Sequence, residues 1–161
     1  RMIDAGEDPL FIARRIVILA AEDVGLADPR ALSISIAAYQ ATHFIGMPEA
    51  RIPLSEATIY LATAPKSNSA YKAIGFALED ASLTPNEAVP LHLRNPITDL
   101  MEDEGYGEGY KYSHDYDNHF AAMQNRPNKI KDHVYYTPSD QGYETKIQRW
   151  HNGRWNKNNQ K

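Results

Sequence analysis

Apolar and polar residues succeed one another along the first half of the chain with the period of a helix, interrupted by residues that start and stop helices. Asp8-Pro9 and Asp28-Pro29 each place a capping carboxylate before a proline suited to the first helical position. Gly25 and Gly46 supply the left-handed backbone that commonly ends a helix. The pattern predicts one helix before each glycine. Because apolar residues surround much of both helices, we expect both to be largely buried.

The next two helices are marked mainly by proline. Ile52-Pro53 opens the third helix, and Ala64-Pro65 ends it because proline disfavours helical geometry in the residue before it. Ser67 or Asn68 then caps a fourth helix that continues through Leu78. Short turns between these helices imply neighbouring, roughly antiparallel packing. No alternating strand pattern interrupts this half of the sequence.

The second half is richer in turn-forming residues. Residues 82–95 read as an extended connection, and Asn95-Pro96 predicts a short fifth helix over 97–104 that Gly105 stops. Residues 105–120 hold too much glycine for a regular element. Seven of the ten tyrosines lie between residues 106 and 143, so we expect their rings to dock this irregular part onto the helices.

A capping-box pattern at Thr137-Pro138 predicts a last helix over 138–150, followed by a polar tail that frays. The stretch 134–136 fits either a very short strand or an extended strap. The predicted fold class is therefore all-α: a helical bundle over 8–81, then an extension over 82–161 packed on it, with an irregular tyrosine-rich segment and a C-terminal helix. Residues 1–7 are expected to be the remnant of a preceding helix or linker in a longer protein, since position 1 is not methionine.

The composition excludes several classes of protein. The 161 residues suit one domain with a real core, and the absence of cysteine excludes disulfides and thiolate metal sites. The longest strongly apolar run, Ile16 to Ala21, is too short to cross a bilayer. The net charge of −4 is unevenly spread: residues 99–119 carry seven acids and one base, and residues 120–161 carry eight bases and three acids. The basic tail permits a local phosphate contact or is simply a solvated surface.

No set of residues predicts catalysis, and no nucleotide-binding loop of the form G-x-x-x-x-G-K-[ST] is present. The best candidate for a metal site is a group of imidazoles and carboxylates that suit zinc: His114, Asp115, Asp117 and His119. The alternative is that these residues lie in surface turns and make local hydrogen bonds. Arg14 and Arg15 lie inside the apolar first helix. Either one of them lies along the surface while the other reaches an acid such as Glu22 or Asp23, or they belong to an interface. Lys66 precedes a helix start and either contacts a phosphate or belongs to a capping turn.

Several motifs in a fixed order resemble the replication-associated recombination protein A family, also called MgsA, whose eukaryotic relatives are the Werner helicase-interacting proteins. The first resembling segments are EDPLFIARR and AEDVGLADP (7–15 and 21–29). The others are GMPEARIPL (46–54), YLATAPKSN (60–68), VPLHLRN (89–95), GYGEGYKYSHD (105–115), YTP (136–138) and GYE (142–144). The resemblance runs from about Ile3 to Ile147, and the sequence departs from the family pattern from Gln148 onward.

The resemblance implies that the full protein is an AAA+ ATPase similar to clamp loaders. It also implies that this chain is the C-terminal domain of that protein, without the ATPase module. It implies a bundle like the clamp-loader collar that gathers the protein into a homotetramer, and no catalytic, nucleotide or metal site in this part. ATP and Mg would belong to the missing module. The implied partners of the full protein are DNA and single-strand-binding protein, in a bacterial, nucleoid-associated cytoplasmic setting without a membrane. The candidate interface residues are Arg14, Arg15, Tyr110 and Tyr112.

Two alternatives to an oligomerisation domain remain open at the level of sequence. The first is a helical module that binds DNA or a replisome partner, with candidate phosphate contacts from Lys66, Lys129, Lys131, Lys146 and Arg149. The second is a metal-dependent helical enzyme that uses the segment 114–119. Salt-sensitive DNA binding distinguishes the first, and a stoichiometric metal ion distinguishes the second.

Overall fold

Every regular element in the part of the chain that the structure describes is helical, which confirms the all-α prediction. The computed structural model describes residues 1–158, with side chains to residue 155. Its α-helices are α1 (Pro9–Leu19), α2 (Arg30–Ile45), α3 (Arg51–Thr63), α4 (Ser69–Leu83), α5 (Asp99–Asp103) and α6 (Glu144–Asn158). Short turns of other helix types lie between them: η1 (Ala20–Val24), η2 (Gly25–Ala27), η3 (Leu91–Leu93), η4 (Ser113–Asp115), η5 (Asp117–His119) and η6 (Asn128–Ile130).

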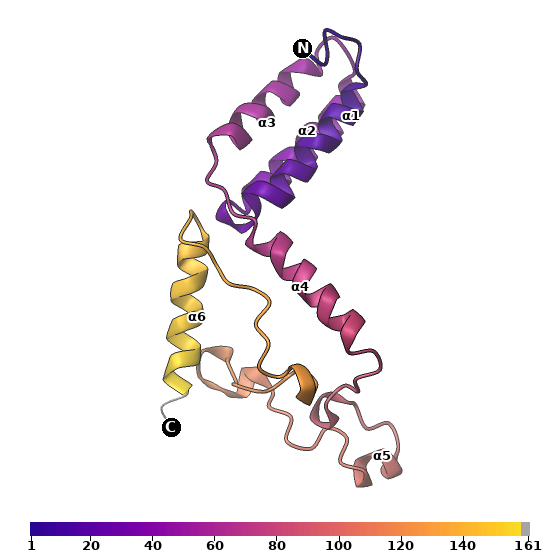
Figure 1. The fold of residues 1–161 in the computed structure, drawn as a ribbon, viewed down its shortest axis with the longest axis vertical. Helices are drawn as coiled ribbons and strands as arrows, with labels where there is room; N and C mark the ends of the chain where they lie inside the picture. Colours follow the sequence, from indigo (N-terminus) through magenta and orange to yellow (C-terminus); the bar gives the residue numbers. More distant parts are fainter. Residues whose placement is uncertain (159–161) are drawn as a thin grey trace. The chain divides into compact units, whose positions relative to one another are not determined.

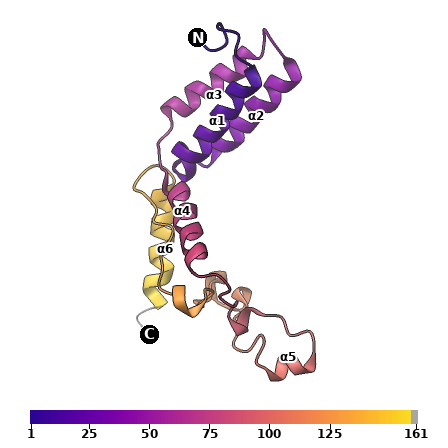
Figure 2. The same ribbon diagram turned by 45° about the vertical axis from the view of Figure 1, so that its right-hand side comes forward.

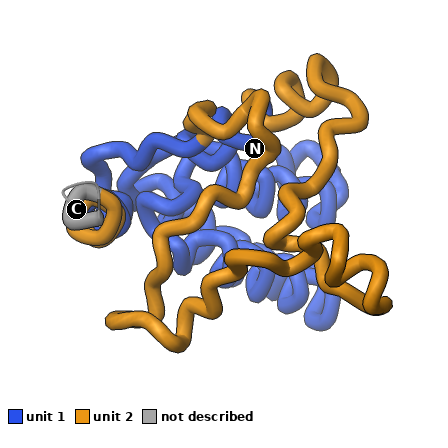
Figure 3. The backbone as a smooth tube through the Cα atoms, turned by 90° about the horizontal axis from the view of Figure 1, so that it is seen from below, with its two compact units in different colours: residues 1–75, 136–149 blue, residues 76–135, 150–161 orange. Residues whose placement is uncertain are grey.

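The chain divides into two compact units, coloured separately in Figure 3. Unit 1 contains residues 1–75 and 136–149, so the start of α6 belongs with the first three helices. Unit 2 contains residues 76–135 and the chain from Trp150 onward. Helices α4 and α6 each run from one unit into the other.

Unit 1 is built on α1, α2 and α3, which lie side by side in Figures 1 and 2 and pack against one another. Five of the nine core residues are alanines, and such small side chains let helices approach closely: Ala13, Ile16, Ala20, Val24, Ala31, Ala38, Leu54, Ala57 and Leu61. Four of the larger apolar side chains of α1 and α2 are exposed instead: Phe11, Ile18, Leu32 and Ile36. The expectation that both helices are largely buried is therefore wrong for the single chain.

The predicted helix starts and stops are mostly confirmed. Asp8 caps α1 by accepting hydrogen bonds from the backbone N–H groups of Leu10 and Phe11, at 2.9 and 3.2 Å. Gly46 ends α2 with a φ of +73°, and α3 stops at Thr63, before Ala64-Pro65. Gly25 does not directly end α1, because the α-helix stops at Leu19 and the π turn η1 fills the interval.

The last helix begins later than predicted. Thr137-Pro138 does not start α6, which begins at Glu144 and continues to Asn158. The expected cap fails because residues 139–143 form a turn instead, in which Ser139 donates its backbone N–H to the Glu144 carboxylate at 2.8 Å. The polar tail is helical to residue 158, so the expectation that it frays is wrong there, and residues 159–161 lie outside the described residues. Helix α5 is also shorter than predicted and is capped by Thr98.

Unit 2 contains little regular structure besides the ends of α4 and α6, and its irregular segments are held by side chains. Asp80 on α4 accepts hydrogen bonds from the Tyr135 hydroxyl at 2.6 Å and pairs with His133 Nδ1 at 2.5 Å. These contacts join α4 to the segment 133–135, which is an extended strap and not a strand. Tyr110, Tyr112 and Tyr116 are exposed, so the prediction that the tyrosine rings dock this segment fails for these three.

Candidate functional site

One carboxylate organises the polar contacts of unit 1. Glu144, the first residue of α6, is fully buried. Its two oxygens accept hydrogen bonds from the hydroxyls of Ser67 at 2.6 Å, Ser139 at 2.5 Å and Tyr136 at 2.9 Å, and from the hydroxyl of Ser69. The Ser139 backbone N–H adds a fifth donor. The Glu144 cluster therefore joins the turn between α3 and α4 to the segment 136–144, which is distant in sequence.

The electrostatics of this cluster favour the ionised carboxylate. Burial alone would raise the pKa of Glu144, but the hydrogen bonds from Ser139, Ser67 and Ser69 outweigh it and lower the pKa to about 2. Burial and the hydrogen bond to this carboxylate raise the pKa of Tyr136 to about 12, so its hydroxyl remains a donor. At neutral pH Glu144 is therefore ionised, and five donors point at its carboxylate.

A second carboxylate anchors the start of α2. Asp28 accepts hydrogen bonds from the Arg30 backbone N–H at 3.2 Å, from the Arg30 guanidinium at 3.0 and 3.1 Å, and from the Tyr60 hydroxyl at 2.5 Å. The Arg30 guanidinium, more than Tyr60, lowers the pKa of Asp28 against the opposing effect of burial. The contact with Tyr60 links the beginning of α2 to α3.

Backbone contacts bring the same segments together closely. Tyr143 donates its N–H to the Ala27 carbonyl at 2.7 Å, and Ser67 donates to the Asp23 carbonyl at 2.8 Å. A Cβ added to Gly142 would lie 2.1 Å from the Ala27 oxygen, and its φ is +50°. Only glycine fits at this position. The resembling segments at 21–29, 60–68, 136–138 and 142–144 thus meet in one place, although 115 residues separate Glu144 from Pro29.

Helix α3 presents a different kind of surface on its outer face. Leu54, Ala57 and Leu61 recur at helical spacing on the buried face. Ile52 and Ile59 lie outside that face and are 61% and 62% exposed. With Arg51, Ser55 and Glu56 they line a shallow hollow of about 680 Å³. This α3 outer face is an apolar surface that nothing else in the described chain covers.

The sequence-predicted interface residues are at the surface. Arg14 pairs with Asp8 at 4.0 Å, and not with Glu22 or Asp23, and lies over the Phe11 ring. Arg15 is exposed beside it. Tyr110 and Tyr112 are exposed in unit 2, where the Tyr112 ring contacts the His114 ring at a tilt of 46°, with centroids 5.0 Å apart.

The sequence-predicted phosphate contacts do not form one cluster. The Lys66 ammonium donates to the carbonyl oxygens of Leu61 and Ala64, both at 2.6 Å, and so caps the end of α3. Lys129 pairs with Glu87 in unit 2, where Lys131 is exposed. Lys146 lies over the Tyr143 ring, and Arg149 is exposed farther along α6 in unit 1.

The group at residues 114–119 that the sequence offers as a metal site makes ring contacts in the structure. The rings of His114 and His119 contact each other at a tilt of 52°, with centroids 4.9 Å apart. Among the described residues, no group of three or more histidine, cysteine, aspartate or glutamate side chains is arranged to hold a metal ion. None of the helices within residues 1–158 combines the length and apolar character needed to cross a bilayer.

Sequence reasoning missed the Glu144 and Asp28 clusters. Glu144 was read only as part of a matched motif, and Asp28 only as a helix cap. The available signal was the recurrence of hydroxyl residues in the motifs and directly after them: Tyr60, Ser67 and Ser69 around the turn between α3 and α4, and Tyr136 and Ser139 before α6. Motifs that share polar residues without catalytic spacing indicate a common contact.

Comparison with known proteins matches nearly the whole chain. A family model described as "MgsA AAA+ ATPase C terminal" matches residues 1–155. Replication-associated recombination protein A of Escherichia coli strain K12 is 47% identical over 148 residues, which cover 91% of this chain and 33% of that protein. The Haemophilus influenzae protein of the same name is 45% identical over 148 residues, with the same coverage. ATPase WRNIP1 of Dictyostelium discoideum is 43% identical over 137 residues, which cover 84% of this chain and 16% of that protein. The chain spans a third or less of these relatives.

Proposed function

Because the chain belongs to the family of MgsA AAA+ ATPase C-terminal domains, we propose that it is the oligomerisation domain of a DNA-dependent ATPase of replication and recombination. In this proposal the domain carries no catalytic residues of its own and gathers four copies of the protein into a homotetramer. ATP and Mg bind in the ATPase module. DNA and single-strand-binding protein are partners of the whole protein, which works in repair at replication forks in the bacterial cytoplasm.

The observation that carries the proposal is the uncovered apolar face of α3. Ile52 and Ile59 are seven residues apart, which is about two helical turns, and they project from a helix whose opposite face is buried. Contiguous exposed apolar surface in a soluble protein marks an interaction site. A surface used in closed symmetric assembly is present in every copy, so one such face serves all subunits.

Two other features support an assembly role. Helix α4 buries none of its residues in the single chain, although Tyr71, Ile74 and Leu78 recur at helical spacing. Phe44, near the end of α2, is 91% exposed. Apolar helices that a monomer leaves uncovered gain stability when a second copy covers them. The Glu144 cluster supports this role indirectly, because it fixes the segment before α6 to the turn where α4 begins.

The proposal is tested by charging the α3 outer face. The double substitution Ile52→Glu and Ile59→Glu should convert the tetramer into smaller species in size-exclusion chromatography with light scattering, because each new carboxylate would have to be desolvated in the interface. The control is Ile97→Glu, which makes the same chemical change at an 83% exposed isoleucine of unit 2. The control should leave the mass unchanged. A tetramer that persists in the double variant would remove the α3 face from the interface.

A second measurement addresses the absence of catalysis in the proposal. The purified chain should show no ATP hydrolysis above buffer, with or without single-stranded DNA. Turnover that copurifies with the chain and survives further purification would contradict the proposed division of labour.

A further inference from the structure

The surface of unit 1 is hollowed where helices α2 and α3 pack together. This α2–α3 hollow has a volume of about 260 Å³, and its lining includes Ile34, Ala37, Ala41, Pro53, Glu56 and Ala57. Pockets for small molecules commonly measure about 300–1,000 Å³. The α2–α3 hollow lies below that range, and it has the size and the mainly apolar lining that suit one large apolar side chain.

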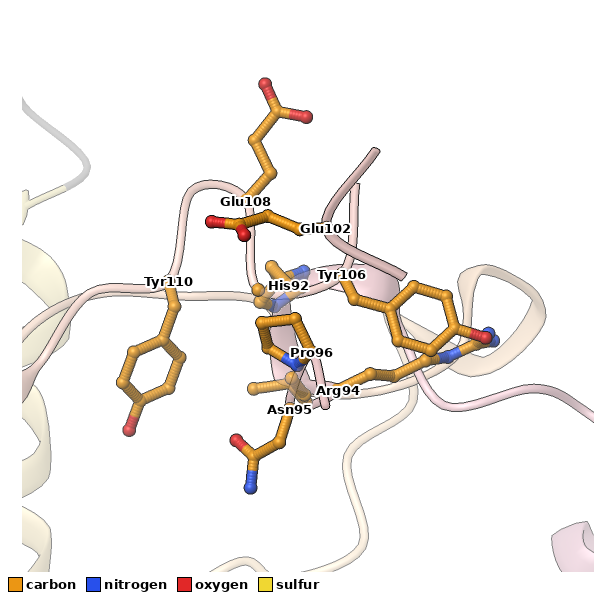
Figure 4. A pocket seen from close by; sticks show the side chains of 10 residues that line it. His92, Arg94, Asn95, Pro96, Glu102, Tyr106, Glu108 and Tyr110 are labelled. Carbon is orange, nitrogen blue, oxygen red and sulfur yellow. The ribbon is translucent and has the colours of Figure 1, made fainter. Parts of the chain in front are cut away.

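The larger hollow of unit 2, of about 720 Å³, offers no comparable fit. Figure 4 shows its side chains, among which the Arg94 guanidinium lies against Tyr106 and donates to the Tyr106 hydroxyl at 3.2 Å. The carboxylates of Glu102 and Glu108 point away from the Tyr110 ring in the same view. The polar groups of that hollow therefore do not gather around one ligand.

Helix α2 itself carries a large apolar side chain that nothing covers. Phe44 is 91% exposed, more than any other large apolar side chain that the structure describes. It follows Ala37 by seven residues and Ala41 by three, and this spacing places all three along one stripe of the helix. Because the ring remains in solvent, it does not fill the hollow of its own chain. One stripe of α2 thus carries both a recess and a projecting ring.

A recess and a projection on the same stripe make a surface that complements itself. When two copies meet about a two-fold axis, the same patch of each copy faces the other, so every contact is made twice. Two α2 helices that run in opposite directions then bring the Phe44 ring of each copy to the recess of the other. A foreign partner would have to supply its own ring, whereas a second copy already has one.

The area that such a contact buries also fits a pair of copies. Two buried phenylalanine rings and the recesses that receive them together remove about 800 Å² from water. This is about half of the ~1,600 Å² that a stable protein interface buries in total. Glu56 lines both the α2–α3 hollow and the hollow of the α3 outer face, so the two surfaces adjoin. The α3 outer face can therefore supply the remaining apolar area.

The charges beside the recess and the ring are opposite in sign. Arg51 begins α3 directly after the turn 46–50, at the end of α2 that carries Phe44, and Glu56 lines the recess. Both side chains are exposed, and neither takes part in an ion pair or a side-chain hydrogen bond within the described part of the chain. A ring inserted from a second copy brings the Arg51 of that copy towards Glu56.

We propose that Phe44 of one copy fills the α2–α3 hollow of a second copy, which returns the same contact. The inference rests on the proposed assembly of copies and deepens it, because it names the contact that pairs two of them. The hydrophobic gain from burying both rings stabilises the pair. The opposite charges of Arg51 and Glu56 favour the antiparallel arrangement of the two α2 helices.

Cysteine cross-linking tests the contact directly, since the chain has no cysteine of its own. Differently tagged Phe44→Cys and Ala37→Cys chains are co-expressed, purified together and oxidised, and mass spectrometry measures the mixed disulfide. The Ala37→Cys copy keeps its own ring, so half of the contact remains. The control pairs Phe44→Cys with Ile36→Cys, a 40% exposed position of the same helix outside the lining. We expect at least about fivefold more mixed disulfide with Ala37→Cys, because only close Cβ atoms can be bridged. Equal yields would overturn the proposal.

Removal of the ring measures what the contact contributes. Phe44→Ala should raise the dissociation constant of the assembly at least about tenfold in light scattering over a dilution series, as expected for a buried aromatic anchor. The control Ile97→Ala, at an 83% exposed side chain of unit 2, should change it less than about twofold. Circular dichroism checks that both variants are folded. A tetramer that Phe44→Ala leaves unchanged would overturn this inference alone. An unmodified chain that stays monomeric at every concentration would overturn the proposed function together with it.

Discussion

At the scale of single residues, Glu144 is the position on which unit 1 depends most. Its pKa of about 2, against an ordinary value of 4.5, means that folding favours the ionised form by about 3 kcal/mol. This stabilisation is fully present above the ordinary pKa and is lost as the pH falls from about 5 towards 2. We predict that Glu144→Gln lowers the free energy of unfolding by about 3 kcal/mol at pH 7 and by little at pH 2.

Denaturant unfolding at both pH values measures this effect. The control is Glu49→Gln, which removes an exposed carboxylate from the same unit and should leave both values unchanged. A wild-type protein whose stability does not fall below pH 5, or a Glu144 variant as acid-sensitive as the wild type, would contradict this description of the cluster.

The close approach at Gly142 gives a second prediction for a single residue. Gly142→Ala should destabilise the fold by about 2 kcal/mol or more, because the new Cβ meets the Ala27 carbonyl and the φ is positive. Gly153→Ala is the matched control: it lies inside α6, and an added Cβ meets no atom within 4 Å. That variant should be stabilised by up to about 1 kcal/mol, since alanine is the better helix former. Thermal unfolding compares the two, and similar shifts in both would contradict the packing at Gly142.

At the scale of elements, the sequence predicted helix boundaries where a local residue decides them. Asp8, Gly46 and Pro65 act within one turn, so α1, α2 and α3 begin or end close to the expected places. The start of α6 could not be predicted in this way. It depends on Ser139 donating to Glu144 and on Tyr143 donating to Ala27, a contact across more than 100 residues. The large apolar residues of α1 and α2 were misjudged because periodicity identifies an apolar face without saying whether the same chain covers it.

A prediction at this scale concerns the attachment of α4 to the strap at 133–135. The Tyr135 hydroxyl and His133 both hydrogen-bond to the Asp80 carboxylate and lower its pKa. Asp80→Asn removes the negative charge that these two hydrogen bonds stabilise. Backbone amides of residues 130–135 should then exchange with deuterium at least about tenfold faster, because the strap loses contacts that protect it locally. The neighbouring substitution Glu79→Gln, at an exposed side chain, is the control. Unchanged exchange in the Asp80 variant would show that other contacts hold the strap.

At the scale of the whole molecule, the chain is a family domain whose matched motifs make contacts with one another. Ser67, Glu144, Asp28 and Tyr60 of those motifs bond to one another in the two clusters, whereas Ile52 of the GMPEARIPL motif is exposed. Such a chain keeps its own fold with buried carboxylates and, in the proposed function, presents apolar helix faces to other copies. The family resemblance indicated this role from sequence, but which face is apolar and uncovered followed only from the packing of α3.

The most direct test of this account is the mass of the unmodified chain in solution. Multi-angle light scattering on a size-exclusion column, from low to high micromolar protein, should give four times the chain mass of 18.2 kDa, about 73 kDa. The mass should fall towards smaller species on dilution or on charging Ile52 and Ile59. A constant mass near 18 kDa at high micromolar concentration would contradict the proposal that this domain assembles the protein.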